Sequence, residues 1–260
     1  MKYYIVDAFA DQLFRGNPAG VCLLDHEIAD TLMQKIAFEN NLAETAFLLH
    51  KENQYFLRWF TPEVEIDLCG HATLATAYVV MNYVSHERKE IEFETNSGKL
   101  TVVREGDVYT LDFPNRRPKP MDQPELLEKA LGCKVLETHL SRDLVVLVED
   151  EETVRNLHLD MDIIKKISRD IAFALIVTAK GNHCDFVSRF FAPNAGIMED
   201  PVTGSAHCSL IPFWNERLHK TKMIAQQLSP RGGVLYCEYC GDRVKIGGTA
   251  VCYLKGELIL

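Results

Sequence analysis

The chain has 260 residues, of which 47% are hydrophobic and 25% charged, a composition typical of a globular protein with one large or two modest domains. Its net charge of −9 argues against a nucleic-acid-binding protein and against a sensor of anionic membranes. No apolar run is long enough to predict a membrane span, and no basic-then-apolar leader precedes residues 3–6. The eight scattered cysteines lack a secretory context, so we expect reduced thiols and a cytoplasmic location.

The first half of the chain is rich in strand-like segments. Strands are expected at residues 2–9, 20–24, 45–49, 55–60, 90–95, 99–105 and 108–113. A one-sided apolar period predicts a helix over residues 26–40. Residues 71–84 carry no charge and are apolar nearly all round, so this helix must be buried on every side, within a surrounding sheet. The proline-rich residues 114–120 are the best candidate for a linker.

The second half follows the same order of patterns. Strands are expected at residues 134–140, 143–149, 174–180, 184–191, 234–240, 243–246 and 251–260. An amphipathic helix is expected over residues 154–170, and a further helix is expected over residues 205–218. The latter should bend or restart near Pro212, because proline has no N–H to donate.

One segment occurs twice. Arg58-Trp-Phe-Thr-Pro62 and Arg189-Phe-Phe-Ala-Pro193 are each followed by an acidic loop and by a glycine that opens an apolar helix. The two arginines stand 131 positions apart, close to half the chain. Their repetition favours a shared structural ion pair. We therefore predict an α+β fold of two pseudo-symmetric units, residues 1–116 and 117–260, each a mixed sheet or barrel around a central apolar helix.

Positions at which the two copies differ in polarity are candidates for chemistry. Glu44 corresponds to Leu175 at the shift of 131, so an acid stands where the sister copy keeps a core residue. Apolar neighbours would partly desolvate this carboxylate and make it useful for moving protons at neutral pH. The alternative is that Glu44 ends its strand and faces solvent, and the sequence contrast leaves both interpretations open.

The two helix starts are candidate anion sites. Free N–H groups and the positive end of the helix dipole lie at Gly70-His71 and at Gly204-Ser205. His71 could relay a proton, or could be a solvated ring on a helix surface. Asp200 could hold a neighbouring group, and Ser205 could bind substrate or simply cap the helix.

Four motifs in this order and spacing resemble the phenazine-biosynthesis PhzF-like isomerase family. They are Asn17-Pro-Ala-Gly20, Glu44-Thr-Ala-Phe47, Gly70-His-Ala-Thr73 and Glu199-Asp-Pro-Val-Thr-Gly-Ser-Ala-His207. Lys245-Ile-Gly-Gly-Thr-Ala250 also fits, and the resemblance covers essentially the whole chain. Many family members carry serine before the glutamate of the second motif, where this chain has Ala43. We expect little consequence of this departure for proton transfer.

The resemblance implies a diaminopimelate-epimerase-like fold with the site in the cleft between the two units. It also implies isomerisation without a cofactor or a metal, in a homodimer. The catalytic roles fall on Glu44, His71, Asp200 and Ser205. A substrate carboxylate is expected at the helix starts, whose remaining residues are Gly70, Ala72, Thr73, Thr203, Gly204 and Ala206.

The working hypothesis is that Glu44 takes a proton from one carbon of a small carboxylate-bearing metabolite and returns it to another. A first alternative is an epimerase or racemase with two thiols, Cys69 and Cys208, which lie near the two helix starts. A second alternative is a protein that binds a small carboxylate without catalysis. Cys237-Glu-Tyr-Cys240 has metal-like spacing, but it lies in a strand-like run and no second pair follows.

Overall fold

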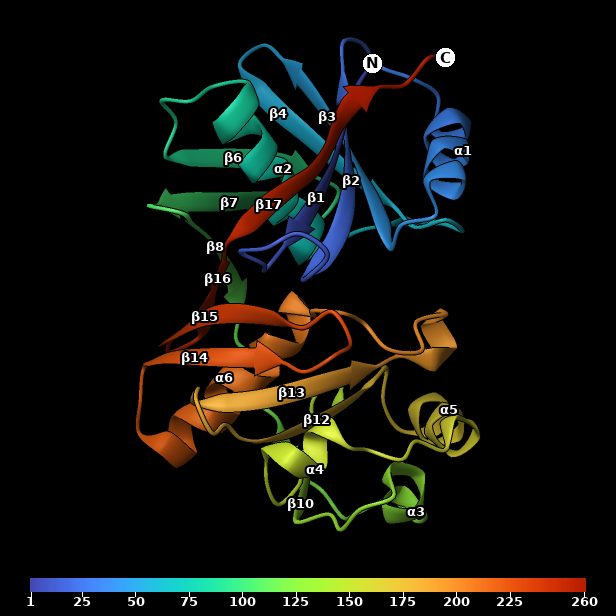
Figure 1. The fold of residues 1–260 in the computed structure, drawn as a ribbon, viewed down its shortest axis with the longest axis vertical. Helices are drawn as coiled ribbons and strands as arrows, with labels where there is room; N and C mark the ends of the chain where they lie inside the picture. Colours follow the sequence, from blue (N-terminus) through green and yellow to red (C-terminus); the bar gives the residue numbers. More distant parts are fainter. The chain divides into compact units, whose positions relative to one another are not determined.

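The computed structural model describes residues 1–260 and contains two compact units. The first comprises Met1–Asp112 and Gly247–Leu260, and the second comprises Phe113–Ile246. The observed boundary, between Asp112 and Phe113, lies close to the expected one between residues 116 and 117. The last strand, however, belongs to the first unit, whereas the expected second unit, residues 117–260, would include it. Strand β17 (Ala250–Glu257) pairs antiparallel with β1 (Lys2–Ala8) over the whole of β1 (Figure 1). This pairing satisfies an edge of β1 that would otherwise expose its backbone groups.

The first unit is built on a mixed sheet. Its other strands are β2 (Asn17–Leu24), β3 (Glu44–Lys51), β4 (Gln54–Phe60), β5 (Glu65–Ile66), β6 (Glu90–Thr95), β7 (Gly98–Glu105) and β8 (Val108–Pro114). Two of the pairings, β2 with β3 and β4 with β6, are parallel. A parallel pair needs a crossover connection. Helix α1 (Asp30–Asn40) lies in the first crossover and α2 (Gly70–Tyr83) in the second.

Helix α2 is the buried centre of the first unit, as its uncharged sequence predicts. Ten of its fourteen residues are buried. It packs against β1, β2, β3 and β17, and Figure 1 shows it among the strands. The apolar circumference of the helix is therefore covered by the sheet that wraps it.

The second unit repeats this topology. Its strands are β9 (Lys119–Pro120), β10 (Glu137–Leu140), β11 (Leu144–Leu147), β12 (Leu175–Lys180), β13 (Phe186–Phe191), β14 (Lys222–Gln227), β15 (Gly233–Cys240) and β16 (Arg243–Gly248). From β10 to β15 the pairings alternate antiparallel, parallel, antiparallel, parallel and antiparallel, as they do from β1 to β7 through β2, β3, β4 and β6. Helix α6 (Gly204–Leu218) occupies the crossover that α2 occupies in the first unit. The predicted duplication is present in the fold.

The repeated arginines make the same contacts in both units. Arg58 forms two hydrogen bonds of 2.7 Å with the carboxylate of Glu65. Arg189 does the same with Glu199, at 2.7 and 2.9 Å. Each guanidinium also lies 5.2 Å from the ring centre of a phenylalanine two positions on along its strand. These bidentate pairs fix the loop that leads to each central helix.

The helix expected over residues 154–170 is two helices. Helix α4 covers Glu151–Arg155 and α5 covers Met161–Asp170, and α3 (Leu127–Leu131), which is as short as α4, precedes them. Each of the two starts has its own cap. The carboxylate of Asp150 accepts the N–H of Thr153, and that of Asp160 accepts the N–H of Ile163. Periodicity alone did not reveal the break, because the apolar pattern continues through it. The N-cap residue Asp160 lies inside that pattern and starts a new helix.

Helix α6 runs through Pro212 without restarting. Residue 212 would normally donate its N–H to the carbonyl of Cys208, four positions earlier. Proline cannot, and the carbonyl of Cys208 instead accepts the N–H of Arg116 at 2.9 Å. The backbone group freed by the proline is therefore satisfied by a neighbouring segment, and the helix tolerates the residue.

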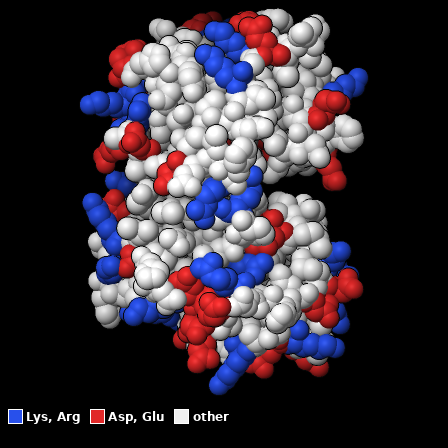
Figure 2. Space-filling view, in the orientation of Figure 1, with Lys and Arg blue, Asp and Glu red and all other residues white.

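None of the helices combines the length and the apolar composition that a membrane crossing requires. On the face seen in Figure 2, acidic and basic side chains are interspersed. That face has no continuous basic stripe of the kind that follows a nucleic-acid backbone.

Candidate active site

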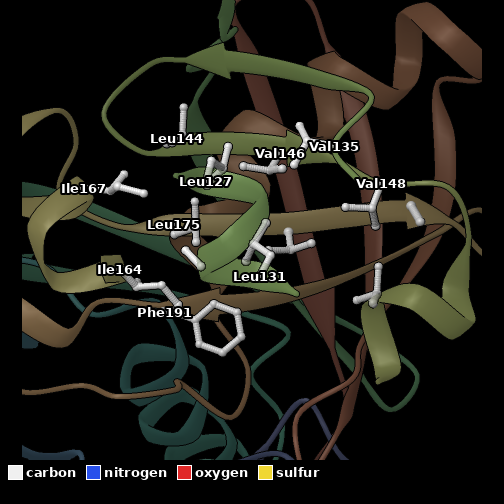
Figure 3. Close-up of a cluster of buried hydrophobic side chains, with 14 of the residues drawn as sticks. Leu127, Leu131, Val135, Leu144, Val146, Val148, Ile164, Ile167, Leu175 and Phe191 are labelled. Carbon is white, nitrogen blue, oxygen red and sulfur yellow. The ribbon is translucent and has the colours of Figure 1, made fainter. Parts of the chain in front are cut away.

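Glu44 is buried at the first position of β3. Its side chain is 10% exposed, which excludes the solvent-facing alternative. Its counterpart Leu175 is the first residue of β12 and is 1% exposed within the apolar cluster drawn in Figure 3. Each is the first residue of a strand that pairs in parallel with the strand before it in the chain. The same backbone site therefore holds a core residue in one unit and a buried acid in the other.

We expect Leu175→Glu to lower the free energy of unfolding by about 3 kcal/mol or more, since a carboxylate in the Figure 3 cluster would be desolvated without a partner. Leu175→Met, which keeps the volume and the apolar character, should cost less than about 1.5 kcal/mol. Urea unfolding of both variants measures the difference. Equal losses would mean that the site accepts an acid as readily as an apolar chain.

The partner that the first unit supplies for Glu44 is His71. His71 is the second residue of α2, and its side chain is 8% exposed, so the solvated-ring alternative is excluded as well. Its Nε2 lies 3.0 Å from Oε2 of Glu44. The two atoms are at ion-pair distance but are not aligned as a good hydrogen bond, so the contact is mainly electrostatic.

Burial and charge act on His71 in opposite directions. Burial by itself lowers the pKa of the ring, but the adjacent Glu44 carboxylate raises it, and the net pKa lies well above 6.5. Burial raises the pKa of the Cys69 thiol. A protonated thiol carries no charge, so the upward direction for His71 rests on Glu44.

The other ring nitrogen of His71 faces two polar groups. Its Nδ1 lies 3.4 Å from the side-chain nitrogen of Asn17 and 3.5 Å from Sγ of Cys69. Asn17 begins β2 and is fully buried, and Cys69 is the residue before α2. Sequence reasoning gave Asn17 no role beyond its motif, because only the pairing of β2 beside β3 brings it to the ring.

The donor atoms of Glu44, Cys69 and His71 all lie within 4.8 Å of one another. Carboxylate, thiolate and imidazole are all ligands of transition metals. However, Glu44 contacts one nitrogen of the ring and Cys69 faces the other. One imidazole nitrogen binds one ion, so this arrangement does not direct the three groups at a common point.

The start of α2 leaves few N–H groups for a ligand. The N–H and the hydroxyl of Thr73 both donate to the carbonyl of Cys69. The first-turn N–H groups of Gly70, His71 and Ala72 have no acceptor within the helix. They are the groups at this helix start that can receive a carboxylate.

In the second unit, Gln227 orders the loop before α6. Its Oε1 accepts the N–H of Thr203 at 2.8 Å, and its Nε2 donates to the carbonyl of Asp200 at 2.7 Å. The Thr203 hydroxyl, in turn, donates to the carboxylate of Asp200. Gln227 lies on β14, a strand that sequence reasoning missed, in the alternating buried pattern of Lys222–Gln227.

We expect Gln227→Leu to destabilise the protein by about 2–3 kcal/mol, because it leaves the N–H of Thr203 and the carbonyl of Asp200 buried without their partner. The neighbouring, less buried Gln226 points to the other face of β14, and Gln226→Leu should stay within about 0.5 kcal/mol of the parent. Amide hydrogen exchange should also rise first at residues 200–206. Unchanged exchange there would contradict the ordering role.

Ser205 does not cap α6. The N-cap position is Thr203, without a side-chain cap, and the hydroxyl of Ser205 lies 3.4 Å from a guanidinium nitrogen of Arg142. Arg142 is held by two hydrogen bonds, of 3.0 and 2.9 Å, to the fully buried Asp143. A fixed cation therefore stands beside the α6 start, and nothing in the local sequence around Ser205 indicated it.

The thiols of Cys69 and Cys208 are both buried. Burial raises the pKa of Cys69 and raises that of Cys208 to about 11. Proximity to a helix start would lower a thiol pKa, but desolvation is the stronger effect at both positions. Cys237 and Cys240 lie on β15, as expected for strand thiols.

The sequence matches the family described as phenazine biosynthesis-like protein over residues 6–256. It is 49% identical to a protein of Pseudomonas aeruginosa named as an uncharacterized isomerase, and the match covers 100% of this chain and 99% of that one. A crystal structure of a phenazine biosynthesis PhzF family protein from Enterococcus faecalis superposes with a TM-score of 0.97 at 50% identity, over 100% and 99% of the two chains.

A more distant structure, described as a probable proline racemase from Agrobacterium radiobacter, shares the fold. It superposes with a TM-score of 0.67 at 10% identity, over 100% of this chain and 93% of that one. The predicted fold class, α+β with two similar units of the diaminopimelate-epimerase-like type, is confirmed.

Proposed function

Because the chain belongs to the phenazine biosynthesis-like protein family, we propose that it is an isomerase that needs no cofactor and moves a proton between carbons of a small carboxylate-bearing metabolite. The observation that carries the proposal is the buried contact between Glu44 and His71, 3.0 Å apart, at a position where the sister unit has Leu175. A relative that is 49% identical over the whole chain bears the name isomerase.

Glu44 is the proton carrier in this mechanism. A carboxylate can take a proton from a carbon next to an electron-withdrawing group and return the same proton elsewhere, so one acid is sufficient. The Nε2 atom of His71 faces Oε2 of Glu44 and stabilises its negative charge. The charged ring also favours the return of the carboxylate form when Glu44 gives its proton back to carbon.

The α2 start supplies a place for the substrate carboxylate. The N–H groups of Gly70, His71 and Ala72 begin the helix that carries His71 itself. A carboxylate held there keeps the reacting carbon near Glu44. The roles of Asp200 and Ser205 in the same reaction, the contacts of Thr203, Gly204 and Ala206 with substrate, the homodimer and the cytoplasmic location stay predictions.

The two alternative functions are less well supported. Two-thiol chemistry needs thiolates, and burial raises the pKa of both Cys69 and Cys208. A passive carboxylate binder has no need for a desolvated acid beside a histidine. Such a pair has a desolvation cost that a binding protein would avoid with neutral groups.

Incubation of the protein with a metabolite extract in D2O tests the proposal. A cofactor-free isomerase should incorporate deuterium at a carbon of one small carboxylate, or convert it to an isomer of equal mass, as seen by mass spectrometry and NMR. Dialysis against EDTA beforehand should leave the labelling unchanged. If a metabolite is retained by the protein yet shows neither deuterium nor isomer, the protein is a binder.

A further inference from the structure

The two ring nitrogens of His71 face different kinds of polar group. The Nε2 atom faces a carboxylate, which can only accept a hydrogen bond. The Nδ1 atom faces the amide of Asn17 at 3.4 Å and the thiol of Cys69 at 3.5 Å. An amide has a donor end and an acceptor end, and a protonated thiol is both a weak donor and a weak acceptor. Burial keeps the Cys69 thiol protonated by raising its pKa.

This difference matters because His71 is buried. When the ring is neutral with its proton on Nε2, the bare Nδ1 needs a donor, which the NH2 group of Asn17 or the S–H of Cys69 provides. When the ring takes a second proton, Nδ1–H needs an acceptor, which the sulfur or the rotated amide provides. Without such partners, one of the two protonation states would have a buried ring nitrogen with no hydrogen bond, and that state would be disfavoured.

We propose that Asn17 and Cys69 are positioning residues that hold Nδ1 of His71 in both of its protonation states, so that the ring gains or loses its second proton at Nδ1 while Nε2–H stays directed at Glu44. The inference rests on the proposed function, because that function is the reason for the ring to change its protonation state. The three residues that it concerns all lie within the first unit. It assigns the buried Asn17 and the residue before α2 a role in setting the protonation state of His71.

The test is a pH titration of the His71 ring in the full chain without substrate, monitored by NMR of the ring nitrogens. In the wild type the neutral ring should carry its proton on Nε2. Cys69→Ala should lower the pH at which the second proton is lost, and Cys69→Ala combined with Asn17→Leu should lower it further, by about one pH unit or more. Cys69→Ser, which keeps a group that can donate and accept, should titrate like the wild type.

A role in packing alone would lower stability in these variants without moving the titration of His71. The inference is overturned if Cys69→Ala and Cys69→Ser titrate alike, or if the neutral wild-type ring carries its proton on Nδ1. If the double variant does not fold, the two single variants at Cys69 still decide the question. Deuterium labelling by the wild type is a separate measurement, so failure of the proposed function and failure of this inference are distinguishable.

Discussion

Glu44→Gln should slow turnover of the metabolite, measured as deuterium incorporation or as isomer formed, by about 10²–10⁴-fold, the usual contribution of a positioned general acid or base. The amide has nearly the size of the carboxylate but cannot accept the proton from carbon. The fold should be retained, because the side chain at this position remains buried beside His71 and can still make a polar contact with Nε2. The variant should still retain the metabolite, since the N–H groups at the α2 start are unchanged.

Glu39→Gln is the matched control for this experiment. Glu39 is exposed on α1, five residues before Glu44, so the same change of charge occurs without loss of a buried acid. Labelling by the control should equal that of the wild type. A Glu44→Gln protein that labels at the wild-type rate would remove Glu44 from the mechanism, whatever the reaction proves to be.

Acid should destabilise the protein through His207. This residue of α6 is fully buried, and burial lowers its pKa to about 4 although its ring donates to the carbonyl of Thr203 at 2.8 Å. The unfolded chain takes up a proton near the ordinary pKa of about 6.5. Between these two values the unfolded state holds more protons, so stability falls as the pH falls. The loss should be about 2 kcal/mol from pH 7 to pH 5 and about 3 kcal/mol in full.

Urea unfolding of the wild type and of His207→Gln across this pH range measures the effect. The glutamine does not titrate and can still donate to Thr203, so its stability curve should lose this slope. The raised pKa of His71 acts in the opposite direction, since its stabilising contribution is present at low pH and is lost as the pH rises. That contribution is common to both proteins and cancels in the difference. His86→Gln, at an exposed position, should keep the wild-type slope; parallel curves for the wild type and His207→Gln would contradict the assignment.

Much of the fold follows from local patterns. The uncharged sequence of α2 predicted that this helix is buried inside a sheet. The repeat at a spacing of 131 residues predicted two units with the same order of strands and helices. The repeated arginines pair with glutamates, as a duplicated structural feature should. Periodicity was less informative where a single side chain caps a helix start. The carboxylates of Asp150 and Asp160 each accept a backbone N–H, and they mark the starts of two helices where one was expected.

The sequence by itself distinguished Glu44 from the other acids, because the two copies of a duplicated chain can be compared with each other. Glu44 is acidic where Leu175 is apolar, and the fold that the two units share does not require an acid at this position. It could not determine what surrounds that acid. His71 meets Glu44 because a helix start and a strand start come together, and Asn17 reaches the ring through the pairing of β2 beside β3. Gln227 orders the loop before α6 from a strand that lies beyond that helix in the sequence. Such contacts depend on the packing of segments far apart in the chain, as does the pairing of the last strand with the first, so only the tertiary structure decided them.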